Sequence, residues 1–156
     1  MLGKKVKSWV AIADGAKARI YSNYGPRLRL KLESELDSES ARHATHELVS
    51  DREGRSFSSA SPRRAGMEAP TDPQTVEKQK FIKELADYLD AAAQRGRFEE
   101  LFLVAAPRTL GELRKRLNGH AGGLVKAELD KDLTNIPEPE LAKHLEPLEI
   151  GKPPLS

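Results

Sequence analysis

"ELFLVAAPRTLGELRKRLN", residues 100–118, is the stretch that decides the fold. It begins with a continuous apolar run that is too short for a helix and is closed by Pro107, as is typical of a strand buried on both faces. Beyond the proline, three leucines recur at helical spacing, Leu110, Leu113 and Leu117. A strand of this kind followed directly by an amphipathic helix indicates parallel pairing within an α/β sheet.

The segments on either side extend this pattern. Residues 71–96 predict a long helix, because Asp72 can cap its start, Pro73 suits the first turn and Gly96 marks the end. Apolar residues recur along it at helical spacing: Ile82, Leu85, Leu89 and Ala92. After the central stretch, residues 123–133 predict another strand and residues 137–148 a short closing helix.

The N-terminal part predicts three antiparallel strands, at residues 8–13, 18–24 and 27–36. Asp14 and Gly15 supply the reversal between the first two strands. In the third, leucines alternate with Arg29 and Lys31, which is the period-two pattern of a strand with one buried face.

The order of these elements, β-β-β-α-β-α-β-α, constrains the topology. Strands separated by helices pair in parallel through right-handed crossovers, so the fourth and fifth strands should lie beside the first. We therefore predict an α/β fold with a mixed five-stranded sheet of order 3-2-1-4-5 and helices packed on it. This is the ribonuclease-H-like arrangement that release-factor middle domains share.

The size and composition indicate one domain. The chain has 156 residues, of which 38% are hydrophobic, and it has no cysteine. We expect a single domain over residues 1–150, with a long basic loop at about 50–72 and a frayed tail at 151–156. The apolar run at residues 9–13 is too short for a signal peptide, so we expect a cytoplasmic protein without membrane insertion and without a cofactor.

Several stretches resemble a known family. They are "WVAIADGAKARIY", "ELVSDREGRSFSSA", "RRAGMEAPTDP", "FLVAAPRTLGELRKRL" and "ELDKDLTNIPEPELAKHL". Their order and spacing are similar to those of the bacterial host attachment family, over about residues 8–148. That family is also classed among bacterial relatives of the archaeal and eukaryotic release factors. Its name describes a requirement for attachment to plant cells, which is a phenotype and not a molecular activity.

The resemblance implies a function for the loop between the third strand and the long helix. In release-factor middle domains this loop carries Gly-Gly-Gln, which promotes peptidyl-tRNA hydrolysis. Here the comparable residues are Ala65, Gly66 and Met67, followed by Glu68, so that motif is not present. We interpret the loop as a basic arm whose phosphate contacts are Arg55, Arg63 and Arg64, and the alternative is a surface excursion without a ligand.

A second candidate site lies where the central strand meets its helix. In open α/β sheets, ligands bind beyond the carboxyl ends of parallel strands, and free amides at a helix start attract anions. Arg108 and Thr109 occupy that position. The alternative is that Pro107 simply begins the helix and Arg108 is solvated.

Two further patterns favour structural roles. His43 and His46 lie three residues apart with Glu47 beside them, but an exposed polar turn explains them better than a metal site does. A nuclease would need several carboxylates around paired magnesium ions. Asp14 ends the first strand, while Asp130 and Asp132 come late in the fifth, so we do not predict a nuclease.

The sequence thus predicts a non-enzymatic binding protein that associates with RNA, the ribosome or a ribosome-associated partner through its basic loop. One alternative is a release-factor-like hydrolase of the peptidyl-tRNA ester, with Gly66 and Glu68 in the active loop. Another is a protein-interaction adaptor needed for attachment. The oligomeric state is left open.

Overall fold

A computed structural model of the chain describes residues 6–24, 27–50 and 73–151. Its centre is a five-stranded sheet of order β3-β2-β1-β4-β5. The strands are β1 (Lys7–Ala13), β2 (Lys17–Tyr24), β3 (Lys31–Asp37), β4 (Glu100–Val104) and β5 (Val125–Leu129). β1 pairs with β2 antiparallel and with β4 parallel, and β4 pairs with β5 parallel. The predicted α/β class and strand order are confirmed.

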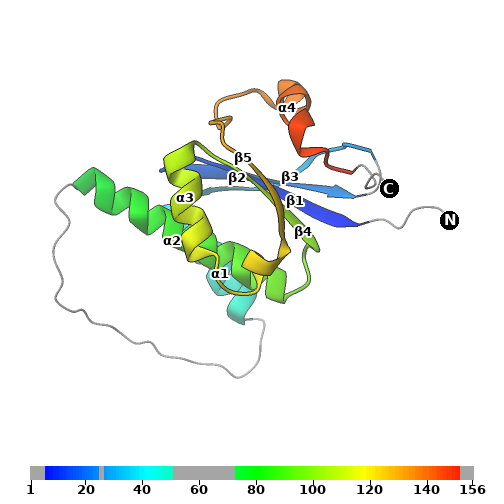
Figure 1. Cartoon of the computed structure of the whole chain (residues 1–156). Coiled ribbons are helices and arrows are strands. Elements are labelled where there is room, and N and C mark those ends of the chain that lie inside the picture. Colours follow the sequence, from blue (N-terminus) through cyan, green and yellow to red (C-terminus); the bar gives the residue numbers. More distant parts are fainter. Residues whose placement is uncertain (1–5, 25–26, 51–72, 152–156) are drawn as a thin grey trace.

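Helices cover both faces of this sheet, but unequally (Figure 1). One face, here called the helical face, carries α1 (Ser38–Ser50), α2 (Pro73–Gln94) and α3 (Pro107–Arg116). The other is covered by the C-terminal lobe, defined as residues 130–151. This lobe contains α4 (Glu138–His144) and the 3₁₀ turn η2 (Glu146–Leu148).

The alternation of side chains along the central strands supplies both cores. In β1, Trp9 and Ala11 face the helices, whereas Val10 and Ile12 face the C-terminal lobe. β4 divides in the same way, since Leu103 packs in the first core and Phe102 in the second. Both central strands are therefore buried on two sides, as the continuous apolar run predicts for β4.

The end of α2 and the start of α3 follow their sequence signals. Gly96 adopts φ +72°, the Arg97 amide donates to Ala92 O and the Gly96 amide donates to Ala93 O, which ends α2 with the glycine-dependent helix cap. α3 begins at Pro107 and buries the predicted leucine stripe, Leu110, Leu113 and Leu117. The predicted cap at Asp72 lies outside the described residues.

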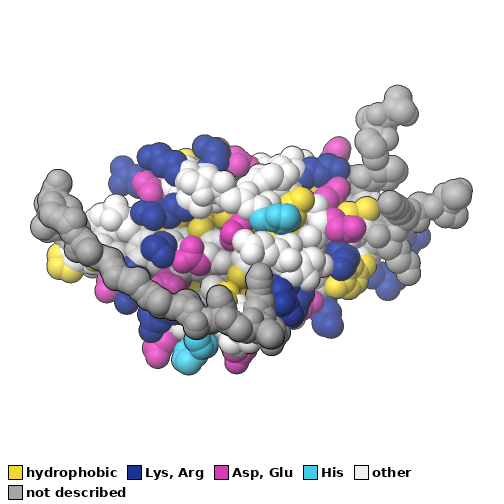
Figure 2. All heavy atoms as spheres, turned by 90° about the horizontal axis from the view of Figure 1, so that it is seen from below, with side chains coloured by type: hydrophobic (Ala, Val, Ile, Leu, Met, Phe, Trp, Pro, Cys, Tyr) yellow, Lys and Arg dark blue, Asp and Glu magenta, His cyan; other side chains and the backbone are white. Residues whose placement is uncertain are grey.

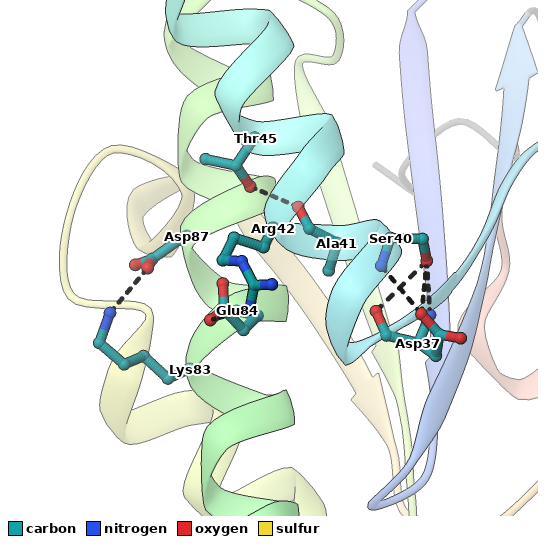
Figure 3. Close-up of polar contacts among 8 residues, drawn as sticks. All are labelled: Asp37, Ser40, Ala41, Arg42, Thr45, Lys83, Glu84 and Asp87. Atoms are coloured by element: carbon teal, nitrogen blue, oxygen red, sulfur yellow. Dashed lines mark hydrogen bonds and ion pairs between the residues drawn. The ribbon is translucent and has the colours of Figure 1, made fainter.

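One helix was not predicted. α1 occupies residues that the sequence favours as an exposed polar turn, and only Ala41 and Leu48 of it are buried. Its start is fixed by reciprocal bonds, because the Ser40 amide donates to Asp37 Oδ1 at 2.9 Å and the Asp37 amide donates to Ser40 Oγ at 2.8 Å (Figure 3). The element order therefore has two successive helices after β3, not one.

α1 also gains stability from packing against α2. Thr45 Oγ1 donates to Ala41 O at 2.8 Å within α1, and Arg42 reaches Glu84 of α2 at 4.0 Å (Figure 3). The Lys83–Asp87 ion pair on the surface of α2 spans one turn at 2.9 Å. A polar segment thus becomes helical because a tertiary neighbour covers its narrow apolar side.

Two strands are shorter than predicted. β3 begins at Lys31, since the Asn23 side chain accepts from the Arg29 amide and donates to Arg27 O, which draws residues 27–29 away from the ladder. β5 ends at Leu129, and residues 121–124 before it form a 3₁₀ turn, η1 (Ala121–Leu124). A Cβ on Gly122 would lie 2.0 Å from Leu117 O, so this tight turn requires glycine.

The predicted closing helix is also divided. α4 ends at His144 and η2 follows, because Pro147 cannot donate a helical hydrogen bond. Among the described residues, no helix has the length and apolar character needed to span a bilayer.

Candidate functional site

The carboxyl ends of the parallel strands gather several loops at one edge of the sheet. Ile12 of β1 pairs with Val104 of β4, and Val104 pairs with Leu129 of β5, so the three strands end side by side. We call this region the carboxyl edge. It comprises residues 13–16, 105–109 and 130–134 together with the first residues of α1 and α2.

All three helices of the helical face begin at the carboxyl edge. α1 follows Asp37, which pairs with Lys17 beside the β1–β2 turn. α3 follows β4 directly, and Pro73 at the start of α2 lines a groove with Asp14. The N-terminal end of a helix carries partial positive charge, which favours a negatively charged group, and at α1 its own Asp37 fills that role.

The groove at the carboxyl edge has a volume of about 520 Å³. It lies between the turn at residues 14–16 and the first turns of α2, where Gln74, Glu77 and Lys78 line it. A Cβ on Gly15 would lie 2.8 Å from Lys78 Cγ, so the absence of a side chain lets the lysine stem cross the turn. Lys78 is an exposed cation at this edge that the sequence reasoning missed.

The two predicted residues at the start of α3 occupy the carboxyl edge. Arg108 is exposed and Thr109 is half-buried. The N-cap residue Ala106 provides no side-chain hydrogen bond to the helix, and the Leu110 amide donates to Ala106 O at 2.8 Å. By contrast, α1 is capped by its own Asp37. Of the two helices, α3 is therefore the one whose first amides have no side-chain cap.

A network of oxygen atoms lies beside it. Thr134 Oγ1 is 2.6 Å from Asp132 Oδ1 and 3.2 Å from Asp14 Oδ2, so one hydroxyl links the two acids. Asp14 Oδ1 also accepts from the amides of Ala16 and Lys17, at 2.7 and 2.8 Å. These carboxylates serve to fix the turn and the loop. Spacing alone gave no signal that Asp14 and Asp132 would meet, because 118 positions of chain separate them.

The remaining sequence candidates are the histidine pair on α1 and the residues of the basic loop. His43, His46 and Glu47 are exposed on α1. Within the described ranges, no three histidine, cysteine or acidic side chains are grouped closely enough to hold a metal ion. The loop candidates lie outside the described residues: Arg55, Arg63, Arg64, Gly66 and Glu68.

The face beside this edge is electrostatically mixed. Figure 2 shows Lys and Arg side chains interspersed with Asp and Glu over the helical face. Several of these charges are paired, as in Lys83–Asp87 and the Arg114 contact with Glu128. Hydrogen bonding and attraction by Glu128 raise the pKa of Arg114 above its ordinary value, which ties that cation to β5. The helical face is therefore not uniformly positive in charge.

A comparison with protein families shows to which family the chain belongs. Residues 9–145 match the model of the family described as "Protein required for attachment to host cells". The chain belongs to this host attachment family. The resemblance noted in the sequence is thereby confirmed, and the match includes each strand of the sheet from Trp9 onward.

The other comparisons add less. No curated protein matches the chain. A solved structure described as "Archaeal protein" is similar with a TM-score of 0.49 and 13% sequence identity, and the match covers 92% of this chain and 34% of that one. The chain thus spans about a third of the length of that protein.

Proposed function

We propose that this member of the host attachment family is a non-enzymatic binding protein whose carboxyl edge contacts the phosphates of RNA, free or within the ribosome. The observation that supports this most directly is the common origin of α1, α2 and α3 at one edge, with Arg108 exposed beside the uncapped start of α3. Phosphate groups suit such a position because both the amides and the guanidinium can donate to them.

The sequence that precedes α2 supplies further cations. Residues 52–64 contain four arginines and one glutamate, and this segment precedes Pro73, which lies at the carboxyl edge. We propose that Arg55, Arg63 and Arg64 add phosphate contacts to those of Arg108 and Thr109, with Gly66 and Glu68 nearby in the same loop. Lys78 is a further candidate contact, since its stem already lies across the β1–β2 turn.

The polar network at the edge favours binding over catalysis. Asp14 is held by two turn amides and by Thr134, and Asp132 accepts from the same hydroxyl. Carboxylates engaged in this way are poorly placed to activate water. The proposal places the protein in the cytoplasm, where it would meet its partner, and the attachment phenotype would follow indirectly.

Ribosome co-sedimentation and fluorescence anisotropy with a labelled single-stranded RNA would test this proposal. Replacing Arg108 by Ala should weaken binding and lower the slope of log K against log salt by about one. The triple change Arg55→Ala, Arg63→Ala and Arg64→Ala should lower this slope further. Lys143→Ala, an exposed cation in the C-terminal lobe, is the matched control and should leave the slope unchanged.

Two results would contradict the proposal. Binding that is absent or insensitive to salt would exclude phosphate contacts. Peptidyl-tRNA release by the wild type that disappears in Gly66→Ala would instead support a release-factor-like hydrolase. An assay of released peptide therefore separates the two functions.

A further inference from the structure

The turn between α3 and β5 contains an asparagine followed by a glycine, Asn118 and Gly119 (Figure 1). α3 ends at Arg116, and the 3₁₀ turn η1 begins at Ala121. Asn118 and Gly119 lie between them, outside helix and strand, and both are exposed. Asparagine is a chemically labile residue, and a following glycine leaves the backbone nitrogen open to its side chain because glycine has no Cβ.

The chemistry open to this dipeptide is an attack of the backbone on the side chain. The Gly119 nitrogen bonds to Cγ of Asn118, and the Cγ–Nδ2 bond breaks. The proton of the Gly119 amide passes through the solvent to the leaving nitrogen, so ammonia departs and a succinimide ring remains. Water then opens the ring at either carbonyl. One opening yields aspartate, and the other yields isoaspartate, in which the main chain runs through the former side chain.

Both reacting groups are free in the folded protein. Among the described residues, none forms a hydrogen bond with the Asn118 side chain or with the Gly119 amide. A backbone amide without an acceptor is more open to the solvent than one in a helix or a strand ladder, so it gives up its proton more readily. An unbonded carboxamide is also free to rotate toward the nitrogen that attacks it.

The β1–β2 turn provides a contrast, because Asp14 is also followed by a glycine, Gly15. Aspartate before glycine cyclises in the same way, with loss of water. Here Asp14 Oδ1 accepts from the amides of Ala16 and Lys17 at 2.7 and 2.8 Å, and Thr134 Oγ1 lies 3.2 Å from Oδ2. These bonds hold the carboxylate in place. The folded chain therefore fixes one such side chain and leaves the other free.

The packing of the turn favours glycine at position 119. A Cβ there would lie 2.9 Å from Asp90 Oδ1 and would displace this carboxylate. Asp90 Oδ1 accepts from the Ala121 amide at 2.9 Å, which fixes the start of η1. The turn thus favours the same residue that makes Asn118 labile.

We propose that Asn118 is a site of spontaneous deamidation, which converts it to aspartate and isoaspartate in the folded protein. The other two asparagines of the chain are protected. Asn23 is buried, and its carboxamide bonds to the backbone of residues 27 and 29. Asn135 precedes the branched Ile136, whose amide donates to Leu133 O at 3.1 Å.

The modification should loosen the turn. Leu117 O lies close to Gly122, since a Cβ on Gly122 would be 2.0 Å from that oxygen. Isoaspartate adds a main-chain carbon between these two positions, and the longer chain should strain their contact. Either product also brings a new carboxylate into the turn that contacts Asp90, where like charges repel.

Mass spectrometry of the full chain, incubated at mildly alkaline pH, tests the proposal. Peptides that contain residue 118 should gain the mass difference between an amide and an acid and should separate into two species. Peptides that contain Asn23 or Asn135 should not change. Labelling with an isoaspartyl carboxyl methyltransferase should mark residue 118 in the folded protein. In urea it should mark Asp14 as well, because the hydrogen bonds of that carboxylate are then lost.

Asn118→Gln provides the matched variant, because it keeps a carboxamide but disfavours ring closure, so the modified species should be lost. Hydrogen exchange in residues 119–125 should accelerate in aged wild type and not in aged Asn118→Gln. Conversion of residue 118 no faster than that of Asn135 would overturn the proposal. So would equal labelling of Asp14 in the folded chain, or modification at an unchanged rate in Asn118→Gln. Unchanged exchange in the aged wild type would overturn the inferred loosening of the turn.

Discussion

The two faces of the sheet are built from the same strands but are covered by different means. On the helical face, α2 brings a long apolar stripe, and α1 and α3 bring shorter ones, into the core that contains Trp9 and Ala11. On the other face, the C-terminal lobe has the seven-residue α4 and a 3₁₀ turn over Val10 and Ile12. The comparison shows that the short cover is held by hydrogen bonds from the sheet as well as by apolar packing.

Arg19 is the principal attachment of the C-terminal lobe. Its Nη2 donates to Leu133 O at 3.0 Å and to Ile136 O at 2.7 Å, while Nη1 donates to Tyr21 Oη at 3.0 Å. The guanidinium also lies 5.7 Å from the Tyr21 ring centroid. Burial raises the pKa of Tyr21 above its ordinary value. Arg19 thus holds the loop that leads into α4 together with Asp14, which bonds Thr134.

The largest expected effect compares one leucine from each face. Leu85 of α2 and Leu141 of α4 are both fully buried. Leu85→Ala should lower the free energy of unfolding by about 4 kcal/mol and Leu141→Ala by about 2–3 kcal/mol, within the range for leucine truncation. The difference is expected because the small lobe can relax around the cavity. Urea denaturation measures both, and equal losses would show that the lobe packs as rigidly as the helices.

The second largest expected effect concerns Arg19, which attaches the C-terminal lobe to the sheet. Arg19→Met keeps much of the side-chain volume but removes the donors to two loop carbonyls, which should cost about 1–3 kcal/mol. Hydrogen exchange should accelerate in residues 133–150 and stay unchanged in α2. Arg29→Met, at an exposed arginine nearby, should show neither change. Uniform acceleration throughout the protein would mean that the two faces unfold as one unit.

The smallest effect concerns the cap of α1. Hydrogen bonds from the Ser40 amide, and then from its hydroxyl, hold the pKa of Asp37 below its ordinary value. A lowered pKa means that the stabilisation is present above the unfolded value of about 4 and is lost as pH falls below it. Asp37→Ala should therefore lower Tm slightly at pH 7 and have little effect near pH 2.

Asp37→Asn provides the control for this titration, because asparagine also caps helices but carries no charge. It should retain most of the stability at pH 7 without the pH dependence. A pH dependence that persists in Asp37→Asn would assign the effect to another carboxyl group.

Much of the fold follows from local patterns. The run at residues 100–107 and the leucine stripe of α3 specify a buried strand and its helix, and Gly96 ends α2 as its position predicts. The start of β3 could not be predicted in this way, because the Asn23 side chain takes the backbone bonds that the ladder would use. The helix α1 could not be predicted for a similar reason, because its narrow apolar side is buried only by packing against α2.

The candidate site was predictable in part. Arg108 and Thr109 follow from the rule that ligands bind beyond strand ends, and the structure places both at the carboxyl edge. Lys78 and the Asp14–Thr134–Asp132 network were not predictable, because their members come from distant parts of the chain.

By itself, the sequence determined the type and order of the buried strands, the helices α2 and α3 on either side of β4, and membership of the host attachment family. These depend on periodicity and on turn residues, which are properties of neighbours along the chain. Only the tertiary structure decided that three helices start at one edge, that Arg19 bonds to the C-terminal lobe, and that Asp14, Thr134 and Asp132 meet. These depend on contacts between segments far apart in sequence, for which no local pattern carries a signal.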